Sequence, residues 1–263
     1  MDLEIDGNAA LVAASSSGLG KAAATTLARE GANVVVNGRD EQRLEATVEE
    51  IRSVADGDVV GQPADLTDPD DVSKLVQRAV DEFGGLDHLV TNAGGPPSKP
   101  FRETTDEEWY DAYDLLVMSV VRLVREAVDH LEAGDGGSIV HSTSHTVKEG
   151  IDGLVLSNSV RMSVIGLEKT LSRELAPDVR VNSVMPGAHQ TDRMEYLIEN
   201  AVERGEFDSY DASYESWTED IPMGDLGSPE EFGNVVAFLL SDRASFINGE
   251  AVMIDGGDAR SNL

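Results

Sequence analysis

The sequence predicts an α/β protein, namely one doubly wound parallel sheet of seven strands with helices on both faces. Two observations support this prediction. Short apolar runs alternate with helix-like segments along the whole chain, which is typical of a parallel sheet joined by crossover helices. A turn of small residues at 13–20 also leads directly from the first apolar run into the first helix-like segment.

The individual elements follow from their composition and their boundary residues. Gly31 ends the first helix, whereas Asp68 and Pro69 begin the third, because aspartate caps free amides and proline fits a first helical turn. The predicted strands cover 9–13, 33–36, 59–64, 86–90, 138–142, 179–184 and 250–254. The predicted helices cover 19–30, 43–54, 69–83, 106–131, 154–176 and 229–240.

A segment of about 40 residues between Pro186 and Pro229 has weaker periodicity and many acidic residues. Insertions of this length at the carboxyl end of a strand are usually functional. We therefore expect residues of about 188–228 to form a lid over a substrate site. Because the chain has no repeat, low-complexity tract or linker, we assign residues 1–263 to a single domain.

The net charge is the unusual property of the composition. Asp and Glu total 50 against 20 Lys and Arg, which gives −30 at pH 7. Such a charge repels phosphate backbones and acidic membranes, so we expect neither nucleic acid nor a membrane as a partner. The acids are dispersed and lysine is rare, which favours a halophilic protein adapted to a salt-rich cytosol. An ordinary acidic enzyme is the alternative.

Other compositional features limit location and chemistry. The chain has no cysteine, so it forms no disulfide and uses no thiol. The five histidines are scattered without ligand spacing, and we therefore predict no metal site. No apolar run approaches ~18 residues, and acids occupy the N-terminus where a signal peptide needs basic residues. We expect a cytoplasmic protein.

The small residues of the turn at 13–20 suggest an anion site. They let a pyrophosphate approach the N-terminus of the first helix, where free N–H groups and the helix dipole favour negative charge. Alternatively, Gly18 and Gly20 only allow the helix to pack closely on the strand. The strand before the turn and the helix after it favour the functional interpretation.

At this turn the chain resembles the short-chain dehydrogenase/reductase family, whose motif is Thr-Gly-x-x-x-Gly-x-Gly. Gly18 and Gly20 match the second and third glycines, whereas Ala14 replaces the first. The resemblance extends over about 250 residues and implies a Rossmann-type fold that binds a dinucleotide. Its further motifs, in order, are Asp65, Asn92-Ala93-Gly94, Pro186-Gly187 with Thr191, and Asp255-Gly256-Gly257.

The cofactor residues that this resemblance implies come from the glycine turn, the ends of the strands and the catalytic helix. They are Ser15, Ser17, Gly18, Leu19, Gly20, Arg39, Asp65, Leu66, Asn92, Ala93, Gly94, Arg161, Pro186, Gly187 and Thr191. Gly38 stands where NAD-specific members carry an acid, and Arg39 can reach a 2′-phosphate. We therefore expect NADP(H) to be favoured over NAD(H). The alternatives are that Arg39 is only a solvated turn residue, or that the adjacent carboxylate of Asp40 offsets its positive charge.

The catalytic tetrad of the family, Asn, Ser, Tyr and Lys, is only partly present. Ser144 follows the fifth predicted strand and matches the serine. Ser157 stands at the tyrosine position, Arg161 at the lysine position and Leu116 at the asparagine position. Serine is far less acidic than a phenol, and a guanidinium stays charged and cannot relay a proton. The chain thus resembles a divergent branch related to 3-oxoacyl-carrier-protein reductases, with Ser144, Ser157 and Arg161 as candidate catalytic residues.

Other side chains could replace the missing acid. His141, His145 and His189 are candidates because imidazole is the usual acid or base near neutral pH. A phenol could also come from the expected lid. The alternative interpretation is that each histidine is only a polar residue at a strand end, and that each tyrosine is only an exposed side chain. The lid tyrosines are Tyr196, Tyr210 and Tyr214.

Three functions remain open at this point. The first is an NADP(H)-dependent oxidoreductase acting on a carbonyl or alcohol, such as a small molecule or an acyl thioester. The second is a nucleotide-binding protein without redox activity, and the third is a lyase or isomerase that reuses the cofactor pocket. The resemblance also implies a homo-oligomer, a tetramer or dimer, packed through the helices around Val121 and Val164.

Overall fold

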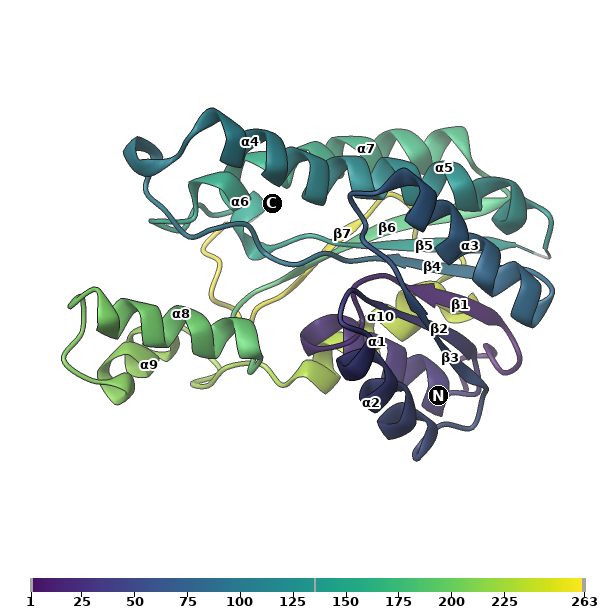
Figure 1. The fold of residues 1–263 in the computed structure, drawn as a ribbon, viewed down its shortest axis with the longest axis horizontal. Helices are drawn as coiled ribbons and strands as arrows, with labels where there is room; N and C mark the ends of the chain where they lie inside the picture. Colours follow the sequence, from purple (N-terminus) through teal and green to yellow (C-terminus); the bar gives the residue numbers. More distant parts are fainter. Residues whose placement is uncertain (1, 135, 262–263) are drawn as a thin grey trace.

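The computed structural model describes residues 2–134 and 136–261, and they form one parallel sheet with helices on both faces (Figure 1). The strand order is β3-β2-β1-β4-β5-β6-β7, which confirms the predicted doubly wound, Rossmann-type fold. The chain winds outward from β1 in both directions, and this creates a crevice at the carboxyl ends of β1 and β4. The strands are β1 (Ala9–Val12), β2 (Asn33–Gly38), β3 (Val59–Pro63), β4 (His88–Thr91), β5 (Gly137–Ser142), β6 (Val179–Pro186) and β7 (Ala251–Ile254).

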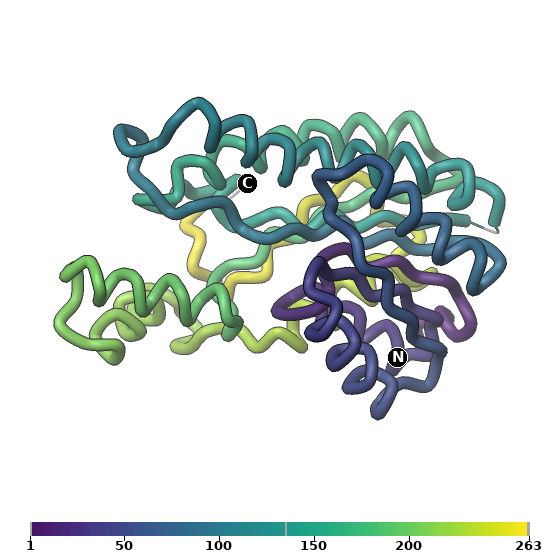
Figure 2. Tube along the Cα trace, in the orientation of Figure 1, coloured from purple at the N-terminus to yellow at the C-terminus, as the bar shows by residue number. Residues whose placement is uncertain are grey.

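Two sets of helices cover the two faces of the sheet, as the ribbon and the tube both show (Figures 1 and 2). One set packs with a core cluster that contains the side chains of α1, α2 and α10. The other set packs with a second cluster that contains side chains of α3, α5 and α7. The helices are α1 (Gly18–Arg29), α2 (Glu41–Arg52), α3 (Pro69–Phe83), α4 (Asp106–Tyr113), α5 (Ser119–Glu132), α6 (Val155–Val160), α7 (Met162–Glu174) and α10 (Pro229–Leu240).

The register of the sheet separates these two cores. Leu11 pairs with Val35 and Leu89, and all three point into the cluster under α3 and α5. The next residue along, Val12, points into the cluster under α1 and α10. Successive side chains of a strand alternate between faces, so a strand buried on both faces must be apolar throughout.

The structure corrects two helix predictions, because both long helices are interrupted. The predicted helix 106–131 consists of α4, a π-helical segment η2 (Asp114–Met118), and α5. The predicted helix 154–176 divides into α6 and α7 at Arg161. Hydrophobic periodicity does not reveal a local change of helical type, since the apolar face continues across the interruption.

The segment between β6 and α10 forms two helices, α8 (Asp192–Glu203) and α9 (Tyr210–Thr218). They project beyond the carboxyl edge of the sheet (Figure 1). Thr191 and Ser209 cap these helices with their hydroxyls. A small apolar cluster of Met194, Ile198, Ile221 and Leu226 holds the segment together. No helix among the described residues is long and apolar enough to cross a membrane.

Candidate active site

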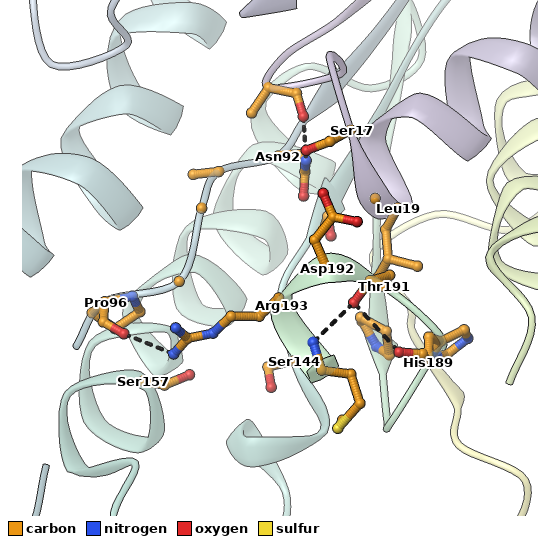
Figure 3. A pocket seen from close by; sticks show the side chains of 18 of the residues that line it. Ser17, Leu19, Asn92, Pro96, Ser144, Ser157, His189, Thr191, Asp192 and Arg193 are labelled. Atoms are coloured by element: carbon orange, nitrogen blue, oxygen red, sulfur yellow. Dashed lines mark hydrogen bonds between the residues drawn. The ribbon is translucent and has the colours of Figure 1, made fainter. Parts of the chain in front are cut away.

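A cavity of about 960 Å³ lies at the carboxyl ends of the strands. It begins at the glycine turn and the end of β2, passes Asn92 and Ser144, and ends beneath α8 and α9. Figure 3 shows side chains from the glycine turn, the loop after β4 and the start of α8 converging on it. Ligands of doubly wound sheets bind in this position, so the cavity is the candidate active site.

The glycine turn brings the backbone of α1 to the surface of the cavity. A Cβ on Gly20 would lie 2.7 Å from Asn92 Nδ2 and would collide with the Ala14 carbonyl, so only glycine allows this approach. Ser17 is the N-cap of α1, yet its side chain makes no capping hydrogen bond. The free amides at this helix end can therefore donate to an anion such as a pyrophosphate.

Ala14, the departure from the family's first glycine, adopts a left-handed backbone with φ of 45°. Two side chains brace it: its amide donates to Asn37 Oδ1 at 3.0 Å, and its carbonyl accepts from Asn92 Nδ2 at 3.1 Å. A non-glycine residue at positive φ costs free energy. The turn thus keeps the geometry that a glycine would adopt without strain.

Two predicted cofactor residues lie behind the cavity wall. Ser15 is completely buried, where its hydroxyl donates to the Val12 carbonyl and accepts from the Asn37 amide. Gly20 is also buried and packs against the turn and Asn92. Both residues support the turn, and neither lines the cavity. Direct contact between Ser15 and a cofactor therefore stays a prediction, while the structure shows the Ser15 hydroxyl engaged in hydrogen bonds within the fold.

The end of β2 combines a close contact with two arginines. A Cβ on Gly38 would lie 2.6 Å from the Cβ of Ser16, so an acidic side chain does not fit there. Arg39 is exposed and lines the cavity, together with Arg43 of α2. Asp40 caps α2 by accepting from the Arg43 amide at 2.8 Å. This end of the cavity is therefore open to a phosphate that two guanidinium groups can reach.

Asp65 and Leu66 line the same end, just beyond β3. Asp65 accepts hydrogen bonds from the amide and hydroxyl of Thr67, at 2.9 and 2.7 Å. These hydrogen bonds hold the pKa of the Asp65 carboxyl below its usual value. An ionised, fixed carboxylate can accept from the amino group of an adenine.

The motifs after β4 and β6 form the middle of the cavity. Asn92, Ala93 and Gly94 line one side, and Pro186, Gly187 and Thr191 line the other. A Cβ on Gly187 would lie 2.7 Å from Asp255 Cβ, which explains the need for glycine beside the closing motif. Asp255 in turn accepts from the amides of Gly257 and Ala259.

Three hydroxyl groups gather at the end of the cavity near Ser144, which we call the catalytic end. Ser144 Oγ accepts from the Thr146 amide at 3.2 Å, and Thr146 Oγ1 lies 3.2 Å from Ser157 Oγ. All three residues line the cavity. The structure thus brings Ser144 and Ser157 into one hydroxyl cluster, and it adds Thr146, which the sequence did not identify.

Arg161 also lines the cavity. Its Nη1 donates to the carbonyls of Thr143 at 3.0 Å and Ser142 at 3.4 Å. Burial, and then the positive charge of Arg193, lower the pKa of Arg161 to about 10. The guanidinium therefore remains charged at neutral pH, and its Nε is buried without a hydrogen-bond partner.

Leu116 stands at the position that the family resemblance assigns to the asparagine of the tetrad. It is 3% exposed, packs in the core under α5 and does not line the cavity, although its neighbour Leu115 does. An apolar side chain at this position cannot hold a water molecule for a proton relay.

The other candidate acids differ in their access to the cavity. His141 is completely buried, lies 2.7 Å from Thr91 Oγ1 and does not line the cavity. His189 lines it but stacks edge-on with Phe232, and burial lowers its pKa. His145 also lines it, with Nδ1 3.3 Å from Asp258 Oδ2. Of the three, only His145 combines access with a carboxylate that orients the ring.

The lid tyrosines do not supply a phenol in this structure. Tyr196 and Tyr210 are exposed, and neither lines the cavity. Tyr214 also lies outside the lining, and its hydroxyl donates to Asp225 at 2.7 Å. Tyr196 and Tyr210 are thus exposed, as the alternative interpretation expects, whereas Tyr214 is partly buried and hydrogen-bonded.

Several cavity residues were not identified from the sequence. Ser16 lies in the glycine turn but was not assigned a role, whereas the others belong to no motif of the family and are identified only by their spatial convergence. Ser16 and Arg43 lie at the phosphate end, while Asp258 reaches the catalytic end from the C-terminal segment. From α8 and α9 come Arg193, Met194, Leu197 and Trp217.

The fold and the cavity define a Rossmann-type α/β protein with its cavity at the carboxyl ends of the strands. A family model described as enoyl-(acyl carrier protein) reductase matches residues 13–258. The chain belongs to this group of the short-chain dehydrogenase/reductase family, whose members are NAD(P)-dependent oxidoreductases.

Similar proteins with names or structures support this assignment over the full length. An uncharacterized oxidoreductase of Bacillus subtilis is 33% identical and aligns over 99% of this chain and 100% of its own. A 3-oxoacyl-[acyl-carrier-protein] reductase of Thermotoga maritima is 30% identical over 97% of this chain and 99% of its own. The L-sorbose reductase of Gluconobacter frateurii, solved with NADPH and L-sorbose, superposes with a TM-score of 0.93 at 32% identity, covering 99% of this chain and 100% of its own.

Proposed function

We propose that this protein is an NADP(H)-dependent oxidoreductase that interconverts a carbonyl compound and an alcohol. One observation carries the proposal: a single cavity joins the dinucleotide-type turn at Gly18 to the hydroxyl cluster of Ser144 and Ser157. The named relatives that reduce 3-oxoacyl thioesters or L-sorbose support the reaction class. Within that class, a small molecule or an acyl thioester is the proposed substrate.

The choice of NADP(H) over NAD(H) rests on the end of β2. Ser16 leaves no room for an acidic side chain at Gly38, while Arg39 and Arg43 are available to a 2′-phosphate. The other residues that would hold the cofactor are the amides of α1, Asp65, Asn92 and Thr191. These residues fit a dinucleotide because the glycine turn leaves its helix amides without side-chain caps.

When bound, the nicotinamide supplies or accepts the hydride. The chain itself must stabilise the negative charge that develops on the substrate oxygen, and this stabilisation is usually the largest catalytic term. We assign it to the hydroxyls of Ser144 and Ser157, with the fixed charge of Arg161 behind them. For the proton, we assign His145, whose Nδ1 lies 3.3 Å from Asp258 Oδ2.

A titration followed by a turnover screen tests this function. NADPH and NADH are titrated by fluorescence in molar KCl, and oxidation of NADPH is then followed with a panel of ketones and 3-oxoacyl thioesters. We expect micromolar NADPH binding and turnover of at least one carbonyl. Binding without turnover would instead favour a nucleotide-binding protein, and turnover without net cofactor oxidation would favour a lyase or isomerase.

We also propose that residues 188–228 act as the substrate lid within one domain. Met194, Leu197 and Trp217 of this segment line the cavity, which supports a role in selecting the substrate. A homo-oligomer, packed through α5 and α7 as in the family resemblance, is a further proposal. Sedimentation velocity in molar KCl tests it, and a monomer at all concentrations would contradict it.

The dispersed negative charge underlies one further proposal, that the protein is adapted to high salt. Repulsion among charges at −30 should destabilise the fold at low ionic strength. The Debye length is about 10 Å at 0.1 M salt and about 3 Å at 1 M, so repulsion should fall steeply. We expect the melting temperature to rise strongly between these concentrations of KCl in differential scanning fluorimetry. A flat response would contradict the halophile interpretation.

A further inference from the structure

Two arginines line the catalytic half of the cavity without a carboxylate partner. Arg161 is held by the carbonyls of Ser142 and Thr143. Arg193, in the first turn of α8, donates from Nη2 to the Pro96 carbonyl and to Ser98 Oγ, both at 3.0 Å. Within residues 2–134 and 136–261, neither takes part in an ion pair.

This absence of a counter-ion is notable because acids outnumber bases by 50 to 20. Arg180 is a useful contrast, since it is also half-buried and bonded to carbonyls. Its two Nη atoms, however, donate to four carbonyls, three of them at the end of α10, so its role is structural. Arg161, by comparison, retains a buried Nε without a partner.

The position of Arg193 is fixed from several sides. Its guanidinium lies 5.1 Å from the ring centre of Tyr196, which stacks on it. A Cβ on Gly95 would lie 3.1 Å from Arg193 Nε, so the glycine admits the side chain. Figure 3 shows Arg193 reaching from α8 toward Pro96. The charge is therefore held in place before any ligand binds, which reduces the entropic cost of binding.

The other side chains in this half of the cavity indicate which ligand groups could bind beside the two arginines. Apolar side chains line this half of the cavity together with the hydroxyl groups of Ser144, Thr146 and Ser157. Two acids also line this region: Asp192, which is exposed, and Asp258, which pairs with His145. The apolar lining residues are Leu115, Ile151, Leu154, Met194, Leu197 and Trp217.

We propose that the substrate carries a carboxylate, held by Arg193 with support from the charge of Arg161, and that the enzyme therefore acts on a keto acid or the matching hydroxy acid. The inference rests on the proposed oxidoreductase function. Arg193 is the residue that determines this specificity, because a guanidinium fork matches a carboxylate and is weakly hydrated. The apolar wall receives the hydrocarbon part of the acid.

Matched pairs of substrates test the proposal. The probes are pyruvate, 3-oxobutanoate and 4-oxopentanoate, each against its methyl ester, with L-sorbose as a neutral ketone. NADPH oxidation is measured at constant ionic strength. We expect kcat/KM for at least one acid to exceed that of its ester by roughly 10- to 100-fold, the range of a hydrogen bond to a charged group. The proposal would be overturned if the esters or L-sorbose had kcat/KM values as high as those of every acid.

Variants separate charge from positioning. Arg193→Gln keeps a donor but removes the charge, and it should abolish the preference by lowering kcat/KM for the acid to near that of its ester. Arg193→Lys should retain most of the preference. Ser98→Ala removes one contact of Arg193 without touching the charge, and should have a small effect. An equal loss for acid and ester in Arg193→Gln would contradict a specificity role.

A binding measurement separates failure of this inference from failure of the proposed function. Calorimetry of the protein with NADP⁺ present compares 4-oxopentanoate with its methyl ester. If no carbonyl is reduced but the acid binds more tightly, and Arg193→Gln removes the difference, the oxidoreductase proposal fails and the carboxylate site stands. If acid and ester bind equally or neither binds, while ketones are reduced, the carboxylate site fails and the oxidoreductase stands.

Discussion

The two ends of the cavity have diverged from the family resemblance to different degrees. At the cofactor end, Gly18, Gly20 and Asp65 match the family, and Ala14 reproduces the backbone of a missing glycine at a φ of 45°. At the catalytic end, only Ser144 matches. By this resemblance, Ser157, Arg161 and Leu116 stand at the positions of a phenol, an amine and an amide, and Leu116 is buried in the core.

This difference shows which requirements are geometric and which are chemical. A dinucleotide is held largely by backbone amides and small residues, so substitutions there must preserve the path of the chain. A developing alkoxide needs only donors and positive charge at the correct place, and different side chains can supply these. The catalytic end can therefore change its residues while the fold and the cofactor turn remain.

The largest expected effect lies at the catalytic end. Ser144→Ala removes the one family-matched donor, and turnover of the best ketone should fall by roughly 10²–10³-fold, in line with loss of one transition-state donor. Steady-state NADPH oxidation measures this. Ser159→Ala, an exposed residue of α6, is the control. Unchanged turnover in Ser144→Ala would mean that another group holds the substrate oxygen.

The next effect tests the cofactor end. Arg39→Ala should weaken NADPH binding by roughly 10- to 100-fold, the range of a charge-assisted hydrogen bond, while NADH binding changes little. Fluorescence titration with both cofactors measures the difference. Arg102→Ala, a similarly exposed arginine outside the cavity, is the control. An equal loss for NADPH and NADH would remove Arg39 from the phosphate site.

A smaller effect is expected when the tyrosine and lysine of the family's tetrad are restored. Ser157→Tyr combined with Arg161→Lys should leave turnover unchanged or raise it, because Ser157 lines the cavity and a tyrosine could extend into that space. Single-turnover NADPH oxidation compares the double variant with the wild type. Turnover seen only in the double variant would show that the native chain binds a cofactor but has lost its acid.

The smallest effect concerns the strained turn. Ala14→Gly should raise the free energy of unfolding by up to about 1 kcal/mol, because relief of the positive φ outweighs the added entropy of the unfolded chain. Denaturation with guanidinium chloride measures this value. Ala14→Val serves as the opposite case, since a β-branched residue is disfavoured at positive φ. A destabilised glycine variant would show that the alanine methyl contributes packing that outweighs the strain.

The sequence by itself determined the parallel sheet and the order of its elements. Strands such as Val34-Val35-Val36 are apolar on both faces, and caps such as Asp68 with Pro69 mark helix starts locally. The cofactor turn was equally predictable, because its glycines are needed within a few residues of one another. Both kinds of signal lie in short stretches of chain, where sequence order and spatial order agree.

Only the tertiary structure decided the composition of the catalytic end. Arg193, Asp258 and Thr146 come from three separate segments, and no local pattern links them. Ser15 shows the reverse case, since its place in the motif predicts a ligand contact, whereas in the structure its hydroxyl is buried and hydrogen-bonded within the fold. A side chain's role depends on which groups surround it after folding, and contacts between distant segments form only when the sheet brings the ends of its strands together.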